Sequence, residues 1–190
     1  MQLLKMDTRA EIINIADALI RAKGYNAFSF TDIGKQLNIK NASIHYHFPT
    51  KTDLGVAIIA QHQKQLSEVI KKNQDNDCLK KLGAFFSIYT IAKSENKICL
   101  IGSLATDLYT VEPAIQDELK KLVKHILEWV TAILEEGRAK KVFYFDIDAR
   151  TKALMIITNM LAAVQLTRLT TKKDFEKIKE TIINDLTNNK

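Results

Sequence analysis

Residues 29–54 read SFTDIGKQLNIKNASIHYHFPTKTDL, and the turn signals in this stretch decide the fold. Ser29 stands three residues before an aspartate, which is a capping pattern for the start of a helix. Asn38 tolerates the left-handed backbone of a sharp turn, and Asn41 can cap a further short helix that Pro49 ends. Two short helices joined by a tight turn predict a helix-turn-helix unit.

Helical patterns continue on both sides of this unit. A Thr8–Glu11 capping box opens a helix upstream, and Thr50 caps a long helix downstream, after which five further segments with helical periodicity follow. Residues 142–145 resemble a strand, but they have no evident partner, so we expect an extended loop there. We therefore predict an all-α fold of about nine helices. It divides into a three-helix helix-turn-helix domain at residues 1–50 and a helical ligand-binding and dimerisation domain at residues 51–190.

The composition supports this fold and excludes several classes of protein. The 190 residues include only six Gly and two Pro, too few for a β-sandwich or an open α/β sheet. Two cysteines are too few for a disulfide framework. The first residues lack the pattern of a signal peptide, and the most apolar segment is too short to cross a bilayer. We expect a soluble, cytoplasmic protein.

Positive charge is concentrated in one part of the chain. The net charge is +6, and residues 21–51 alone hold five basic side chains against one acid. A local positive field of this kind favours a polyanionic partner such as nucleic acid.

Several short motifs in the first 55 residues occur in the order and spacing of a known family. They are Gly24-Tyr25, Phe30-Thr31-Asp32-Ile33-Gly34, Ala42 through Phe48, and the Phe-x-x-Lys-x-x-Leu pattern that ends at Leu54. With these motifs the sequence resembles the TetR/AcrR family of transcriptional repressors. The family often has Tyr where this chain has His45. The resemblance implies a homodimer that binds a near-palindromic DNA operator and is released by a small-molecule inducer.

The third helix is the expected DNA-reading element, because the major groove admits one helix whose N-terminal side chains reach base edges and phosphates. Lys51 in the first turn of the next helix opposes the helix dipole, which makes sense if a phosphate binds at that helix N-terminus. Thr31 can hold another phosphate in the same way. The predicted DNA contacts are Thr31, Lys40, Asn41, Ala42, Ser43, His45, Tyr46, His47 and Lys51.

The C-terminal part is expected to bind a ligand and a second copy of the chain. The predicted eighth helix is apolar nearly all round, so one of its faces should bury against another subunit, and the resemblance implies a dimer formed by the last two helices. It also implies a small-molecule pocket, for which Asn159 is favoured because a polar group in a buried helix needs a partner. The candidate lining residues, for which a plain core role stays open, are Phe86, Tyr89, Leu104, Leu108, Trp129, Ile133, Met155 and Asn159.

The sequence contains no motif for enzymatic chemistry. It has no phosphate-binding Gly-rich loop, nucleophile elbow or metalloprotease motif. His45 and His47 stand two residues apart, and on a helix they point in different directions and cannot share a metal ion. We expect no enzyme, no metal and no cofactor. A helical adaptor that uses its head for protein contacts is the alternative function, and a small helical enzyme is a third.

Overall fold

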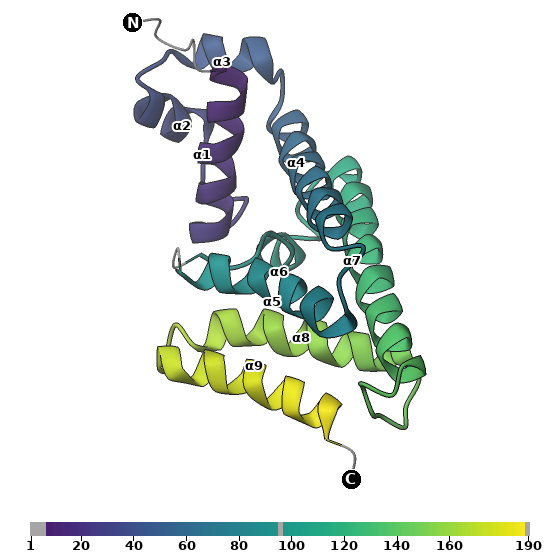
Figure 1. Ribbon diagram of the computed structural model, residues 1–190. Coiled ribbons are helices and arrows are strands. Elements are labelled where there is room, and N and C mark those ends of the chain that lie inside the picture. The colour runs from purple at the N-terminus through teal and green to yellow at the C-terminus, as the bar shows by residue number, and fades with distance from the viewer. Residues whose placement is uncertain (1–6, 95–96, 189–190) are drawn as a thin grey trace, which may run out of the picture. The chain divides into compact units, whose positions relative to one another are not determined.

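Nine α-helices are found in the described part of the chain, residues 7–94 and 97–188 of a computed structural model, and no strand occurs there. The order along the chain can be followed by colour in Figure 1. The predicted all-α fold is confirmed, and residues 142–145 form a loop. The helices are α1 Thr8–Lys23, α2 Phe30–Leu37, α3 Asn41–His47, α4 Lys51–Lys72, α5 Cys78–Ser94, α6 Leu100–Thr106, α7 Pro113–Ala139, α8 Ala149–Leu166 and α9 Lys172–Thr187.

The predicted start of the first helix is wrong. Asp7, and not Thr8, is the N-cap of α1, because its carboxylate accepts the Arg9 N–H at 3.0 Å. Helix α7 continues through Gly137 to Ala139, although a glycine often ends a helix. Here Gly137 is buried inside the helix, where its missing side chain makes room for the ring of Phe143.

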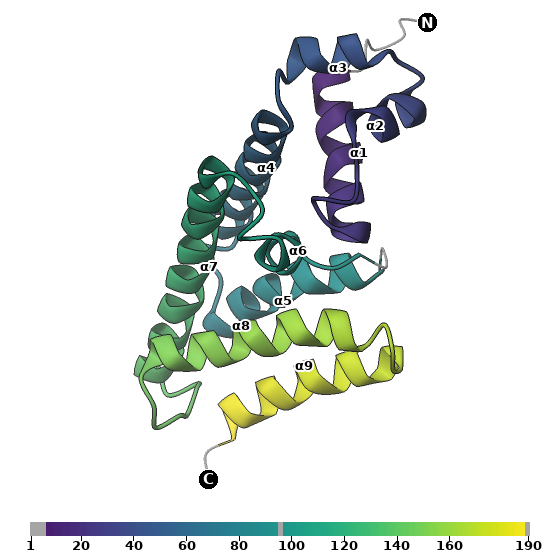
Figure 2. The same cartoon turned by 180° about the vertical axis from the view of Figure 1, so that it is seen from behind.

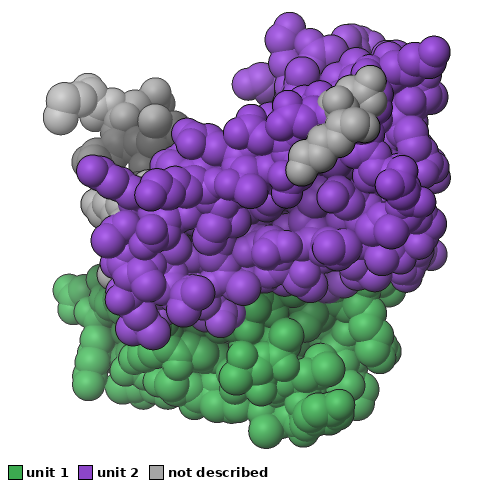
Figure 3. Space-filling view, turned by 90° about the horizontal axis from the view of Figure 1, so that it is seen from below, with its two compact units in different colours: residues 1–64, 100–122 green, residues 65–99, 123–190 purple. Residues whose placement is uncertain are grey.

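The chain divides into two compact units, which Figure 3 colours separately: residues 1–64 with 100–122, and residues 65–99 with 123–190. Helices α1, α2 and α3, here called the head, pack on one another in unit 1. Their contact faces are apolar and fully buried at Ile12, Ile33 and Ile44. The proposed division at residue 50 stays a prediction.

Helix α6 belongs to the same unit as the head and packs against α1. The buried Ser103 hydroxyl donates to the carbonyl oxygen of Ile20 at 2.6 Å, near the end of α1. Just beyond that end, the Asp107 carboxylate accepts the N–H of Tyr25 at 2.8 Å. The carbonyl oxygen of Ile20 thus accepts two hydrogen bonds, since the N–H of Gly24 also donates to it at 2.9 Å.

Polar contacts also connect α1 to α4 in unit 1. The Asp17 carboxylate lies 2.7 Å from Nε2 of His62 on α4 and 3.2 Å from Arg21, one turn along α1. Burial by itself raises the pKa of Asp17, but the hydrogen bond and charge of His62, together with Arg21, outweigh it and hold that pKa below its usual value. Nearby, the Gln61 amide donates to Asn14 at 3.1 Å.

Unit 2 is built around α8, which packs against α5 and α9. Helices α8 and α9 lie side by side and run in opposite directions in both Figure 1 and Figure 2. An ion pair of 2.7 Å between Lys81 and Glu136 connects α5 to α7. In the described residues no helix is long and apolar enough to cross a membrane.

Candidate nucleic-acid interface

In the turn between α2 and α3, the backbone of Gly34 lies close to the backbone of Ile39. Asn38 takes the left-handed conformation, with φ 53° and ψ 43°, as the sequence predicts. A side chain at Gly34 would come within 2.9 Å of the carbonyl oxygen of Ile39. The glycine therefore lets the chain turn tightly enough to place α3 against α2.

Asn41 lies at the start of α3, but it does not cap the helix as predicted. Lys40 occupies the N-cap position, and Asn41 is the first helical residue. The Asn41 amide instead donates to the hydroxyl of Thr31 at 2.9 Å. This bond brings together two of the predicted DNA-binding residues, one from the first turn of α3 and one from the first turn of α2.

His45 stands one helical turn after Asn41 and also faces α2. Its ring meets the Phe30 ring edge-on, with the ring centroids 4.8 Å apart. Its Nδ1 lies 3.1 Å from the carbonyl oxygen of Pro49. The imidazole is thus held between α2 and the link from α3 to α4, while the side chain as a whole stays exposed.

Lys51 opens α4, and its side chain turns back toward the link between α1 and α2. Its ammonium donates to the carbonyl oxygen of Phe28 at 2.6 Å and lies 4.2 Å and 4.6 Å from the ring centroids of Phe28 and Tyr25. Burial lowers the pKa of Lys51, against the charges of Asp107 and Asp32, which raise it. The predicted cap of this helix is confirmed, since the Asp53 N–H donates to the Thr50 hydroxyl at 3.1 Å.

The remaining predicted DNA-binding residues form an exposed polar surface on α3. Tyr46 is 86% exposed. The half-buried His47 ring packs edge-on against it, with the centroids 5.2 Å apart. The other exposed positions of this surface are Lys40, Ala42 and Ser43.

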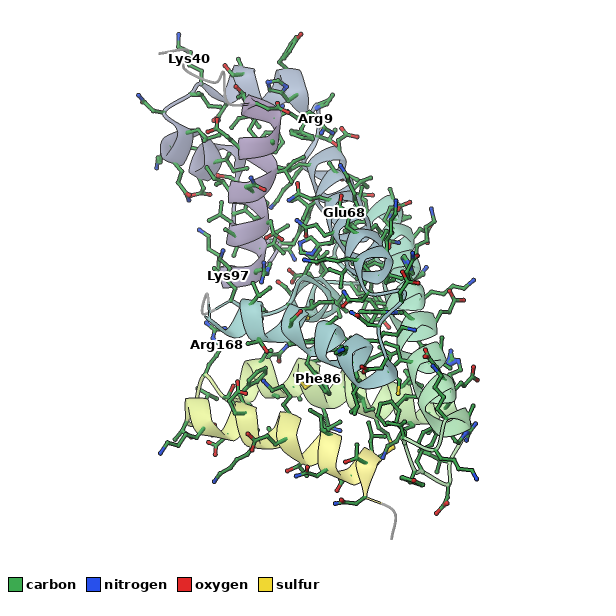
Figure 4. All side chains as sticks on the ribbon, in the orientation of Figure 1. Arg9, Lys40, Glu68, Phe86, Lys97 and Arg168 are labelled. Atoms are coloured by element: carbon green, nitrogen blue, oxygen red, sulfur yellow. The ribbon has the colours of Figure 1, made fainter. Side chains whose placement is uncertain are left out.

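Sequence reasoning missed Arg9, whose guanidinium lies 5.0 Å from the centre of the Phe48 ring. The ring follows α3, so the contact places an exposed cation of α1 beside the reading helix. Figure 4 shows Arg9 and Lys40 in the head. The two contact partners are far apart in the sequence, and no local pattern signals their meeting.

The predicted ligand-lining residues are divided between the units. Leu104 and Leu108 belong to unit 1, and the other six belong to unit 2. Sequence reasoning missed Phe85, which lies in unit 2. The centroid of its ring lies 5.3–6.3 Å from the centroids of three other aromatic rings. This aromatic cluster consists of Phe85, Phe86, Tyr89 and Trp129, and Figure 4 shows Phe86 on α5. Ile133, on the same helix as Trp129, is buried.

The expectation that Asn159 is a buried polar group is wrong. Asn159 is exposed on α8, and its amide donates to the carbonyl oxygen of Met155 at 2.7 Å. Met155 is also exposed, at 49% of its surface. Both side chains therefore lie on the outer face of α8 in the single chain, and their contact with a ligand stays a prediction. Among the described residues, no three His, Cys, Asp or Glu side chains gather where a metal could bind.

Comparison with known proteins connects this geometry to a family. Residues 12–58 match the model described as bacterial regulatory proteins of the tetR family, and residues 78–180 match the tetracyclin repressor-like C-terminal domain. The chain is similar to the structure of a TetR transcriptional regulator from Legionella pneumophila, with 36% identity and a TM-score of 0.86 over 97% of this chain and 100% of that one. A TetR family regulator from Agrobacterium tumefaciens gives 26% identity and a TM-score of 0.87, over 95% of this chain and 97% of that one.

A further relative is the biofilm operon icaADBC HTH-type negative transcriptional regulator IcaR of Staphylococcus aureus (strain Newman). It is 25% identical over 132 residues, which are 68% of this chain and 71% of that protein. The two family models together cover the head and most of the remaining helices. The chain therefore belongs to the TetR family of bacterial regulatory proteins, and it is a DNA-binding transcriptional regulator, not an enzyme.

Proposed function

We propose that the protein is a repressor that binds a near-palindromic operator as a homodimer and is released from it by a small apolar molecule. The observation that carries the proposal is the exposed polar surface of α3, braced against α2 by the bond between Asn41 and Thr31. A side-chain brace of this kind holds a reading helix in a fixed orientation, which base-edge contacts require. The name of the similar IcaR, a negative transcriptional regulator, supports repression.

Exposed cations of unit 1 support contact with the DNA backbone. Arg9, Lys23, Lys35 and Lys40 are all exposed in unit 1. Lys51 adds a fifth cation at the start of α4. Its ammonium has three donors, and the carbonyl oxygen of Phe28 takes one, so the others are available to a phosphate at the same helix N-terminus.

Pairing of two chains is supported by the outer face of α8. Leu154, Met155 and Leu166 are 40%, 49% and 57% exposed, and in a soluble protein such an apolar face favours association with another chain. Two-fold pairing would present two reading helices to successive major grooves, about 34 Å apart. This spacing is the reason for expecting a near-palindrome.

The experiment that tests the proposal measures binding to double-stranded fragments as a function of salt. Genomic fragments are selected with the wild-type chain, and the affinity of Lys51→Ala for a selected fragment is then measured at several salt concentrations. We expect the variant to weaken binding and to reduce the slope of log K against log salt by about one unit for each head. Lys120→Ala is the matched control, because Lys120 is exposed on α7 and pairs with Asp117 at 3.0 Å. A chain that retains no fragment at low salt would overturn the proposal.

Release by a small molecule can be tested by measuring the tryptophan fluorescence of unit 2. We propose that the aromatic cluster forms one wall of the effector site, and Trp129 is the single tryptophan of the chain. A metabolite that releases the fragment should therefore also change the tryptophan emission. If the metabolite releases the fragment but does not change the tryptophan emission at the releasing concentration, the effector binds outside the aromatic cluster.

A further inference from the structure

The hydrogen bond of His45 determines which of its ring nitrogens carries the proton. Nδ1 lies 3.1 Å from the carbonyl oxygen of Pro49. A carbonyl oxygen only accepts, so Nδ1 must be the donor in this bond. In the neutral ring the second nitrogen, Nε2, then has no proton and is an acceptor.

The neutral His45 ring is consequently unable to donate to a phosphate. Phosphate oxygens only accept hydrogen bonds, and the one N–H of the neutral ring is already given to Pro49. A tyrosine, which the resembled sequences often have at this position, carries a hydroxyl donor at any physiological pH. His45 becomes an equivalent donor only when Nε2 also gains a proton.

The position of His45 favours a phosphate as the group it meets. Its ring contacts Phe30 in the first turn of α2 and Pro49 just before α4. It therefore lies between two helix N-termini, which attract anions through their free N–H groups and their dipoles.

The carboxylates of these two first turns are bonded to the residues that precede each helix, and Lys51 gives one of its three N–H donors to Phe28. On α2, the Asp32 carboxylate accepts from the N–H and hydroxyl of Ser29 at 2.7 Å and 2.8 Å. On α4, Asp53 accepts the N–H and hydroxyl of Thr50 at 2.9 Å and 2.7 Å, and Lys51 donates to Phe28. On α3 itself, neighbouring Asn41 is uncharged.

We propose that a DNA phosphate completes this site by drawing a second proton onto His45, so that binding to DNA takes up protons and strengthens as the pH falls. The inference rests on the proposed docking of α3 on the duplex. The proton comes from the solvent and binds Nε2, which then donates to the phosphate while Nδ1 keeps its bond to Pro49. His45 thereby makes the affinity of the head for DNA depend on pH.

The test measures proton uptake directly. A duplex selected by the wild-type chain from a random-sequence library is titrated calorimetrically at about pH 7 in two buffers of different ionisation enthalpy, and the affinity is followed between about pH 5.5 and 8. His45→Tyr supplies a donor that does not titrate in this range. His125→Gln is the matched control, because it removes a histidine of α7, outside the head.

For the wild-type chain we expect an uptake of up to about one proton per bound head, and an affinity that rises by up to about tenfold per head for each unit of falling pH. His125→Gln should behave in the same way. His45→Tyr should still bind the duplex but show neither buffer-dependent heat nor this pH slope.

Three results would overturn the inference. The first is a pH-independent wild-type affinity, and the second is an unchanged proton uptake in His45→Tyr. The third is an affinity that falls with falling pH, because Nε2 would then accept from a base amino group and lose this bond on protonation. If neither the wild-type chain nor His45→Tyr binds a duplex at any pH, the proposed function itself fails. This outcome differs from the three above, in which the duplex is bound.

Discussion

The space beside Gly137 shows how one residue decides the path of the chain after α7. The ring of Phe143 is buried against this glycine, and the N–H groups of Val142 and Phe143 both donate to its carbonyl oxygen, at 2.9 Å and 3.1 Å. A methyl group at position 137 would overlap the ring. The loop that leads to α8 therefore depends on the absence of a side chain at this point.

Replacing Gly137 by alanine is expected to destabilise the protein by about 1–3 kcal/mol, because the added methyl overpacks a buried site. Gly83→Ala on α5 is the matched control, since no atom lies within 4 Å of the methyl it would add. Alanine favours a helix over glycine, so this control should gain up to about 1 kcal/mol. Chemical denaturation at equal protein concentration compares the two, and a destabilisation of the same size in both would contradict the packing argument.

At the scale of elements, polar side chains connect α1 to the helices that follow it. Asp17 bonds to His62 on α4, and Ser103 on α6 bonds to the carbonyl end of α1. Helix α4 continues into unit 2 after residue 64, and α6 follows directly after residues of unit 2 in the sequence. The orientation of α1 thus depends on side chains that are remote in sequence.

Removing the charge of Asp17 should weaken the attachment of α1 to α4. Asp17→Asn leaves His62 and Arg21 without their shared carboxylate, and we expect a loss of about 1–3 kcal/mol at neutral pH. The folded pKa of Asp17 lies below its usual value, so its stabilisation is present above the unfolded pKa and is lost as the pH falls through the folded one.

The wild-type chain should consequently lose more stability than Asp17→Asn when the pH is lowered from about 7 to about 3. Denaturation at the two pH values measures this difference. Asp117→Asn is the control, because its ion pair with Lys120 is exposed and contributes at most about 1 kcal/mol. Equal pH dependence in the wild-type chain and Asp17→Asn would contradict the assignment.

At the scale of the whole molecule, the protein should be a dimer through the outer face of α8. Met155→Glu places a charge on this apolar face, and we expect sedimentation to give the mass of one chain where the wild-type protein gives the mass of two. The separated heads would then bind a two-site operator about a hundredfold or more weakly. Tyr109→Glu is the control, because Tyr109 is 95% exposed in unit 1 and not on α8. A variant that still sediments as two chains would rule out this face.

The local patterns in the sequence predict the helices well because caps and turns depend on neighbouring residues. The capping pairs at Ser29 and Thr50 and the left-handed Asn38 all occur as predicted. The predicted cap at Asn41 is wrong, because the Asn41 amide bonds to Thr31 on another helix and a lysine occupies the cap position. The predicted burial of Asn159 is wrong as well, because the composition of α8 does not show which of its faces is covered.

Local patterns are enough to predict the all-α fold, the helix-turn-helix and the family, since these follow from periodicity, capping and motifs within short windows. The partners of individual side chains are seen only in the folded chain, where Arg9 lies over Phe48, Lys51 donates to the carbonyl oxygen of Phe28, and His45 donates to that of Pro49. Each of these contacts depends on how the helices pack and on which carbonyl oxygens are left without a helical partner. A local sequence pattern predicts neither the packing nor these free carbonyl oxygens.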